Sequence, residues 1–226
     1  MLNLLARAVV ALGKVTIGCK NFTRKYCMNN LEKSKYLHKK ATELLTNTLL
    51  PYYLQKYGEI IYTGSYDLDL MVWADIDLQI ILPNDKSKSR LEMILDISNA
   101  FLLDSNCKNI KLINFSLSNK PNMPKGMYLG VNFKQNDTQI VWKIDVCALD
   151  EEDQKKSYEF HKQLKERLTP ELSDFILQWK FKIMTKCGMT RMPQLSSYFL
   201  YQAILIYNLR TDQEIWNFLE KNGVVI

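Results

Sequence analysis

The chain is poor in the residues on which several common classes of protein depend. Among 226 residues it has only five cysteines, which are odd in number and never spaced Cys-x-x-Cys: Cys19, Cys27, Cys107, Cys147 and Cys187. With so few thiols, scattered in this way, neither a disulfide framework nor a zinc site is supported. The pattern favours a reducing compartment, and we expect a cytoplasmic protein.

Histidine is scarcer still. His38 and His161 are the only two, and both lie in lysine-rich, helix-like stretches that are predicted to be solvated. Catalysis by a Ser/His or Cys/His pair needs an imidazole held beside the nucleophile. The sequence offers almost no support for that class of enzyme.

Long runs of one kind are also lacking. No block of five or more like charges occurs, although the net charge is +6 and the pI is near 8.9. Such a balance permits nucleic acid without arguing for it, because a triphosphate pocket also needs cations. The apolar N-terminus is interrupted by Arg7 and Lys14 and is too short to span a bilayer. Residues 1–27 are predicted to be either an extension outside the folded core or an upstream reading-frame artefact, and no membrane partner is expected.

The most informative segment that is present is a short acidic strand. Residues Asp75 to Leu82 (DIDLQIIL) alternate polar and apolar side chains over their first half, as a half-buried strand does. Successive side chains of a strand point to opposite faces, so Asp75 and Asp77 are predicted on one face with Cα atoms roughly 7 Å apart. Two carboxylates at this spacing suit hard divalent cations, which prefer oxygen ligands.

A Gly-Ser turn precedes this strand. Gly64 and Ser65 follow a short strand predicted over Glu59 to Thr63 (EIIYT). Glycine lets the backbone approach a phosphate closely, and Ser65 is predicted to cap the run YDLDLMVW as a helix with free N–H groups facing the phosphate. Asp67 and Asp69 are expected to decorate the first turns of that helix rather than to bind metal.

A third carboxylate is expected from a later strand. In QIVWKIDVCAL, Asp145 lies on the polar face of an otherwise apolar strand, where an acid seldom stays buried without a partner or a metal. Asp145 is therefore our third candidate ligand. The alternative is that Asp75 and Asp77 form the wet face of a strand while Asp145 pairs with Lys143 or another cation.

Together, these motifs resemble the nucleotidyltransferase superfamily typified by DNA polymerase beta and the aminoglycoside nucleotidyltransferases. The segment YTGSYDLDLMVWADIDLQIIL is also similar to small, uncharacterised bacterial nucleotidyltransferase-domain proteins. The resemblance covers about residues 55–150. It implies that Gly64 and Ser65 contact a triphosphate, and that Asp75, Asp77 and Asp145 hold two Mg²⁺ ions.

The remaining pattern predicts an α/β (α+β) protein, and the resemblance implies that its fold is that of the nucleotidyltransferases. A mixed sheet of about five strands flanked by helices is expected within a catalytic domain over residues 28–150. A helical C-terminal part is expected over 151–226, opened by charged helix residues after Asp150 and by Thr169-Pro170. Lys182 and Lys186, four apart on one helix face, are candidates for triphosphate binding, whereas Lys180 lies on another face. The alternative is that these lysines only solvate the helix.

The predicted function is transfer of a nucleoside monophosphate from an NTP, with ATP the expected nucleotide, to a hydroxyl acceptor with release of pyrophosphate. A small molecule or a protein is favoured as acceptor over nucleic acid. A catalytically silent nucleotide-binding or regulatory module and an RNA-directed transferase are the alternatives.

Overall fold

One mixed β-sheet organises the molecule. The computed structural model of the chain describes residues 28–47, 50–81, 90–117, 125–136 and 138–224. Within these residues five strands are ordered β1-β2-β5-β4-β3. Strands β2 and β5 are parallel and the other neighbours are antiparallel. The strands are β1 (Glu59–Thr63), β2 (Asp75–Ile81), β3 (Cys107–Asn114), β4 (Gly126–Lys134) and β5 (Val141–Leu149). The predicted fold class, a mixed sheet flanked by helices, is confirmed.

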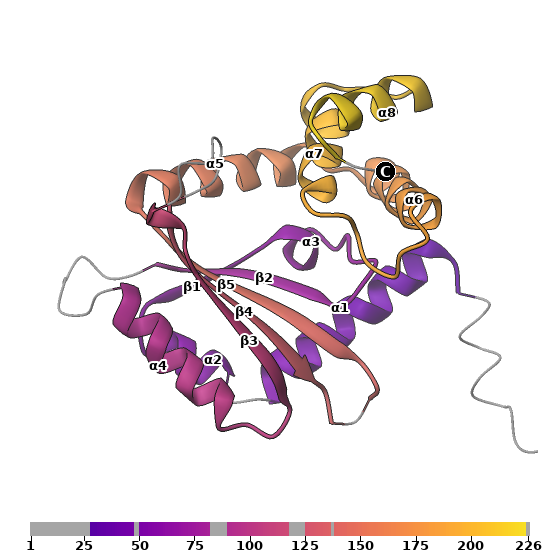
Figure 1. Cartoon of the computed structure of the whole chain (residues 1–226). Coiled ribbons are helices and arrows are strands. Elements are labelled where there is room, and N and C mark those ends of the chain that lie inside the picture. Colours follow the sequence, from indigo (N-terminus) through magenta and orange to yellow (C-terminus); the bar gives the residue numbers. More distant parts are fainter. Residues whose placement is uncertain (1–27, 48–49, 82–89, 118–124, 137, 225–226) are drawn as a thin grey trace, which may run out of the picture.

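Three helices cover one face of the sheet: α1 (Asn30–Asn47), α2 (Leu50–Gln55) and α4 (Arg90–Leu102) (Figure 1). Alternate strand residues point into the space beneath them and form a buried apolar cluster with the helices. Strand positions in this cluster include Ile76, Leu78, Leu129, Val131, Ile144 and Val146. Because strand side chains alternate, the residues between these positions are on the opposite face, where the acidic positions lie.

A reciprocal pair of hydrogen bonds between Asn29 and Glu32 opens helix α1. The backbone N–H of Glu32 donates to Asn29 Oδ1 and that of Asn29 donates to Glu32 Oε2, both at 2.9 Å. Within the described residues the helix runs to Asn47. Pro51 lies in the first turn of α2, where a missing N–H breaks no helical hydrogen bond.

The chain after the sheet is helical, as expected. It contains α5 (Glu151–Arg167), α6 (Pro170–Lys186), α7 (Ser196–Tyr201), the π-helical η3 (Gln202–Ile206) and α8 (Asp212–Lys221). The short 3-10 turn η2 (Phe115–Leu117) follows β3. Thr169 caps α6, and Thr211 with Glu214 forms a capping box at the start of α8. These helices share a second buried apolar cluster, away from the first.

The second cluster also includes residues that precede strand β2 in the chain. Leu68, Leu70 and Val72, in the segment between α3 (Gly64–Asp67) and β2, pack among the C-terminal helices, while Met71 packs into the first cluster. The division into residues 28–150 and 151–226 stays a prediction, and residues 1–27 lie outside the described part. None of the described helices combines the length and apolar character needed to cross a membrane.

Candidate active site

Strand β2 carries two of the candidate ligands. Ile76 and Leu78 are buried in the first cluster, while Asp75 and Asp77 are half-buried on the opposite face, as the alternation predicts. Further along that face Gln79 is covered by α5, and its Nε2 donates to Ser157 Oγ at 2.6 Å. The two carboxylates therefore lie on a sheet face that is closed at one end by α5.

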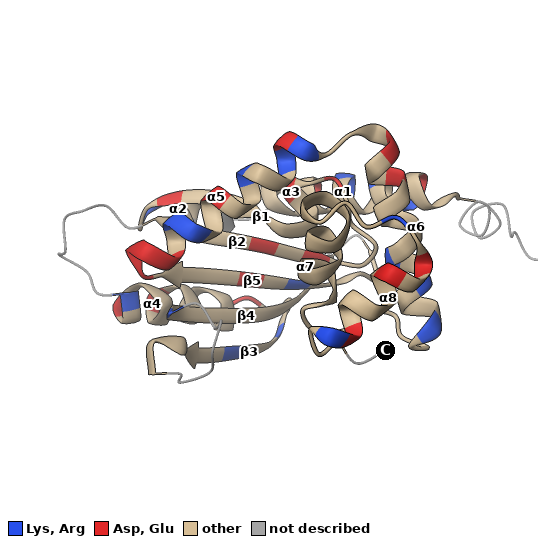
Figure 2. Cartoon of the chain, turned by 90° about the horizontal axis from the view of Figure 1, so that it is seen from above, with Lys and Arg blue, Asp and Glu red and all other residues tan. Residues whose placement is uncertain are grey.

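Strand β5 supplies the third carboxylate. In the parallel pair β2–β5, Asp77 is the register partner of Asp145, so the two side chains point to the same side of neighbouring strands. Figure 2 shows the acidic segments of β2 and β5 side by side on this face. One carboxylate oxygen from each of Asp75, Asp77 and Asp145 lies within 4.8 Å of the other two. The predicted geometry of the triad is thus present.

Lys143 of β5 also lies in this group. Its Nζ is 3.3 Å from Asp75 Oδ1 and donates a hydrogen bond to Asp145 Oδ2. The pairing of Asp145 with Lys143, predicted as the alternative to a metal site, is therefore observed alongside the clustered triad. Burial works against the charge of Lys143, but Asp75 and Asp145 outweigh it and raise the pKa of the ammonium above its usual range.

The clustered acids disfavour one another's charge. Burial raises the pKa of Asp75 to about 6, opposed by the ammonium of Lys143 and supported by the charge of Asp145. Burial, and then the charges of Asp75 and Asp145, raise the pKa of Asp77 well above its usual value. A group of acids in this state gains from a bound cation, because the cation offsets both the lost hydration and the mutual repulsion.

The Gly-Ser turn lies beside the triad. Thr63, the last residue of β1, is the register partner of Asp77, and the chain turns at Gly64 with a φ of 64°. A Cβ added at Gly64 would lie 2.3 Å from Asp77 Oδ2, well inside van der Waals contact. Only glycine fits there, because of both the left-handed backbone and the close approach of this carboxylate.

Ser65 does not cap a helix, contrary to the prediction. Helix α3 spans only Gly64–Asp67, and Thr63 is its N-cap. The run that was predicted as a longer helix continues as turns to β2. The Ser65 hydroxyl is instead buried and accepts a hydrogen bond from Lys180 Nζ at 2.8 Å, with Tyr201 Oη 3.1 Å away.

Lys180 is the cation that the sequence reasoning set aside. Its side chain is fully buried, and its ammonium donates to Ser65 Oγ, to the Leu70 carbonyl at 2.7 Å and to Tyr201 Oη at 2.9 Å. It lies on α6 in line with buried Ile176 and Ile183, four residues after one and three before the other. That apolar periodicity was the available signal, since a lysine on a buried stripe must have polar partners.

The two lysines predicted to bind triphosphate lie elsewhere on α6. Lys182 forms an ion pair with Asp212 of α8, and its Nζ lies 4.5 Å from the ring centre of Trp179. Lys186 Nζ lies 4.2 Å from the ring centre of Trp216. Neither has a described contact with the Gly-Ser turn or the carboxylates. Their nucleotide-binding role stays a prediction.

Other polar contacts hold the turn in place. Asp67, at the end of α3, accepts from Lys165 Nζ and lies 2.5 Å from His161 Nε2, both on α5. Burial works to raise the pKa of Asp67, but the hydrogen bonds from His161 and Lys165 outweigh it and lower the pKa. The prediction that His161 is solvated is wrong, since its side chain is only 13% exposed.

Tyr128 of β4 is a further contact that the sequence analysis missed. Its hydroxyl donates to Asp145 Oδ1 at 2.9 Å, and its ring packs against Phe115. Burial and the charge of Asp145 raise the pKa of Tyr128, which keeps the phenol protonated as a donor. Tyr128 can reach Asp145 because Gly130, the residue opposite Asp145, has no side chain; a Cβ there would meet Tyr128 Oη at 2.5 Å.

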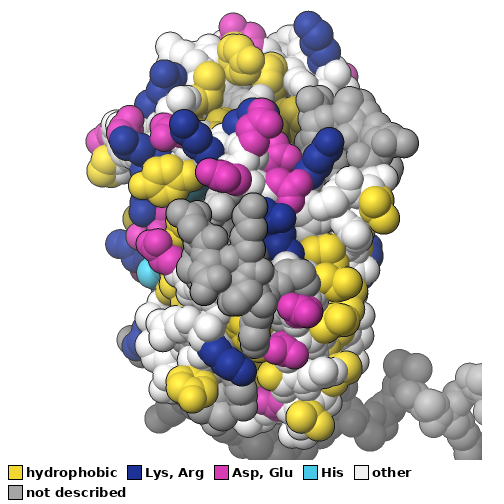
Figure 3. All heavy atoms as spheres, turned by 90° about the vertical axis from the view of Figure 1, so that its left-hand side faces the viewer, with side chains coloured by type: hydrophobic (Ala, Val, Ile, Leu, Met, Phe, Trp, Pro, Cys, Tyr) yellow, Lys and Arg dark blue, Asp and Glu magenta, His cyan; other side chains and the backbone are white. Residues whose placement is uncertain are grey.

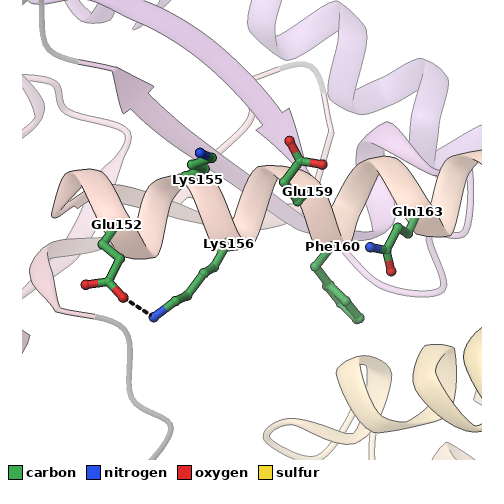
Figure 4. A pocket seen from close by; sticks show the side chains of 6 residues that line it. All are labelled: Glu152, Lys155, Lys156, Glu159, Phe160 and Gln163. Carbon is green, nitrogen blue, oxygen red and sulfur yellow. Dashed lines mark hydrogen bonds and ion pairs between the residues drawn. The ribbon is translucent and has the colours of Figure 1, made fainter.

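A hollow of about 420 Å³ lies along α5, lined by Glu152, Lys155, Lys156, Glu159, Phe160 and Gln163 (Figure 4). None of the three carboxylates or the Gly-Ser residues lines it. Acidic and basic side chains are also interspersed over the face of the molecule seen in Figure 3. Neither the hollow nor this mixture of charges indicates a ligand site other than the triad.

No protein-family model matches the sequence, and no curated protein matches it. Among solved structures, the chain is similar to one in the structure of the non-canonical poly(A) polymerase complex GLD-2–GLD-3, with a TM-score of 0.45 and 15% sequence identity. The alignment covers 87% of this chain and 64% of that one, so this chain spans less than two thirds of the other's length. A likeness of this degree does not assign an activity to the chain.

Proposed function

We propose that the chain is a nucleotidyltransferase that moves a nucleoside monophosphate from an NTP, ATP in our proposal, to a hydroxyl acceptor. One observation carries the proposal: Asp75, Asp77 and Asp145 converge within 4.8 Å beside the turn at Gly64 and Ser65. In the reaction the acceptor oxygen bonds to the α-phosphorus, the bond to the β-phosphate oxygen breaks, and pyrophosphate leaves. The hydroxyl proton is lost to solvent.

The residues present fit Mg²⁺, because the clustered donors are carboxylate oxygens and two of them have raised pKa values. Asp75, Asp77 and Asp145 would hold two ions. When bound, such ions activate the attacking oxygen and neutralise charge on the leaving group.

The turn and α6 serve the triphosphate in this proposal. Gly64 lets the backbone pass close to Asp77, and so brings the Ser65 region next to the metal ligands. Lys180 holds Ser65 and the Leu70 carbonyl, and contributes a positive charge that favours the ionised form of Asp77. We assign Lys180 the role of positioning the turn, and keep Lys182 and Lys186 as proposed contacts for the outer phosphates.

A second candidate is a silent nucleotide-binding or regulatory module. The observation in its favour is Lys143, whose ammonium forms ion pairs with both Asp75 and Asp145. A small molecule or a protein remains our proposed acceptor, with RNA as an alternative, and a cytoplasmic location remains a proposal.

The test is incubation of the protein with each α-labelled NTP, Mg²⁺ and cell extract, followed by identification of whatever becomes labelled. We expect one labelled class of acceptor, Mg²⁺-dependent pyrophosphate release, and loss of both in Asp77→Asn. Mg²⁺-dependent ATP binding without pyrophosphate release would instead support the silent module. Full pyrophosphate release by the variant would contradict the assigned triad.

A further inference from the structure

The ammonium of Lys143 bridges two of the three clustered carboxylates. Lys143 is the register partner of Asp75 across the parallel strands and stands two residues before Asp145 on its own strand, so all three side chains share one face. Its Nζ contacts Asp75 Oδ1 at 3.3 Å and Asp145 Oδ2 more closely. The side chain is about one-third exposed, so solvent reaches part of it, and its Nζ lies 5.7 Å from the ring centre of Trp73.

Both oxygens of Asp145 are engaged within the chain. Oδ1 accepts from Tyr128 and Oδ2 accepts from Lys143. A metal ion bound to Asp75 and Asp145 has oxygen ligands at about 2.1 Å. An ion that close to both oxygens would approach the bridging ammonium closely, and two cations at such a distance repel strongly away from bulk water. The ion and the ammonium therefore exclude each other from this position.

We propose that metal binding at the triad is a cation exchange, in which the ion displaces the Lys143 ammonium from Asp75 and Asp145. This inference rests on the metal site of the proposed function. Without metal, Lys143 offsets one of the three clustered negative charges and so stabilises the folded sheet. The same contact weakens the affinity of the free protein for divalent cations.

The exchange couples metal binding to nucleotide binding. Once displaced, the ammonium has lost two carboxylate partners, and a triphosphate bound beside the Gly-Ser turn would supply new anionic oxygens. Nucleotide should therefore tighten metal binding, and metal should tighten nucleotide binding by the same factor. Lys143 then serves as a positioning residue whose contact changes with the state of the site.

The test measures Mn²⁺ binding without nucleotide, from the electron paramagnetic resonance signal of the free ion. Lys143→Met should bind the first Mn²⁺ about tenfold more tightly than wild type, which corresponds to about 1.4 kcal/mol. Lys143→Arg, which keeps the positive charge, should bind as wild type does. Lys111→Met is the matched control: it removes an exposed charge from β3, opposite Gly130 in the row of Asp145, without a described contact to the triad. We expect its affinity within about twofold of wild type.

A second measurement uses the wild-type chain, in case Lys143→Met does not fold. The lysine ammonium signals of ¹⁵N-labelled protein are followed during a Mg²⁺ titration, with the Lys143 signal assigned from Lys143→Arg. The Lys143 signal should move and saturate with the same affinity as the metal.

An unmoved Lys143 signal at saturating Mg²⁺, or equal Mn²⁺ affinity in folded Lys143→Met, overturns the exchange but leaves the metal site in place. Tighter Mn²⁺ binding in Lys143→Met without any nucleotidyl transfer by the wild type overturns the proposed function and supports the exchange. Absence of Mn²⁺ binding in every variant overturns both.

Discussion

Asp77→Asn should stabilise the metal-free protein while abolishing transfer. Asp77 is held among Asp75 and Asp145, and its pKa is raised well above the usual value by burial and by their charges. For Asp75, the rise of the pKa from 3.8 to about 6 corresponds to about 3 kcal/mol of destabilisation at a pH above both values. Replacing Asp77 with a neutral amide removes its own ionisation penalty, which includes the repulsion from Asp75 and Asp145.

The sign of the pH dependence follows from the raised pKa. An acid whose pKa is higher in the folded state binds protons more tightly when folded, so stability falls as pH rises through the window between about 4 and the folded pKa. The advantage of Asp77→Asn should be present at pH 8 and vanish below about pH 4. We expect a gain of about 1 to 3 kcal/mol at pH 8, or a rise in Tm of several degrees for a chain of this length.

The assay is thermal unfolding at pH 8 and at pH 4, each with and without Mg²⁺. At ten times its Kd, Mg²⁺ should stabilise the wild type by about 1.4 kcal/mol, and Asp77→Asn should lose most of that gain. Glu59→Gln, at an exposed position of β1, is the control for loss of one negative charge. A metal-free Asp77→Asn protein that melts below the wild type at pH 8, or that responds equally to Mg²⁺, would refute the reasoning.

Three further outcomes are expected. Gly64→Ala should lower the free energy of unfolding by about 1 to 3 kcal/mol, because its Cβ meets the Asp77 carboxylate at a positive φ; denaturant unfolding checks this, and an unchanged midpoint would contradict it. Lys180→Met should lower the free energy of unfolding by about 2 to 4 kcal/mol, because it leaves the Leu70 carbonyl unpaired, and calorimetry should show weaker ATP binding. Lys182→Met should lower the free energy of unfolding by no more than the loss of a surface ion pair does, about 1 kcal/mol. Mg²⁺ affinity should fall severalfold from pH 8 to pH 5.5, since Asp75 with its pKa of about 6 must lose its proton to bind metal; a flat profile in a binding titration would oppose this.

The strands and the triad were accessible from the sequence because strand phase is a local property. The period of two placed Asp75 and Asp77 on one face without any knowledge of their neighbours. Asp145 could be assigned to a polar face in the same way. Its partner strand was not predictable locally, and the parallel register that sets Asp145 beside Asp77 is a tertiary result.

The cations of the site were harder to predict, because their roles depend on what packs above the sheet. Lys182 and Lys186 satisfied a helical spacing rule, yet the α6 face that meets the Gly-Ser turn carries Lys180. The predicted length of α3 was also wrong. The apolar residues after Asp67 are divided between two cores on different sides of the segment, and a single helix face cannot serve both.

That division makes the segment after the Gly-Ser turn a shared part of two hydrophobic cores. A fragment ending at residue 150 would expose Leu68, Leu70 and Val72, whose packing partners come from the helices after it. It would also lack Lys180, so the Ser65 hydroxyl and the Leu70 carbonyl would lose their donor. Separately expressed halves should therefore be aggregation-prone, and mixing them should recover function only if they fold together. Any movement of α6 would shift Lys180 and, through it, the turn beside the three carboxylates, which couples the C-terminal helices to the candidate site.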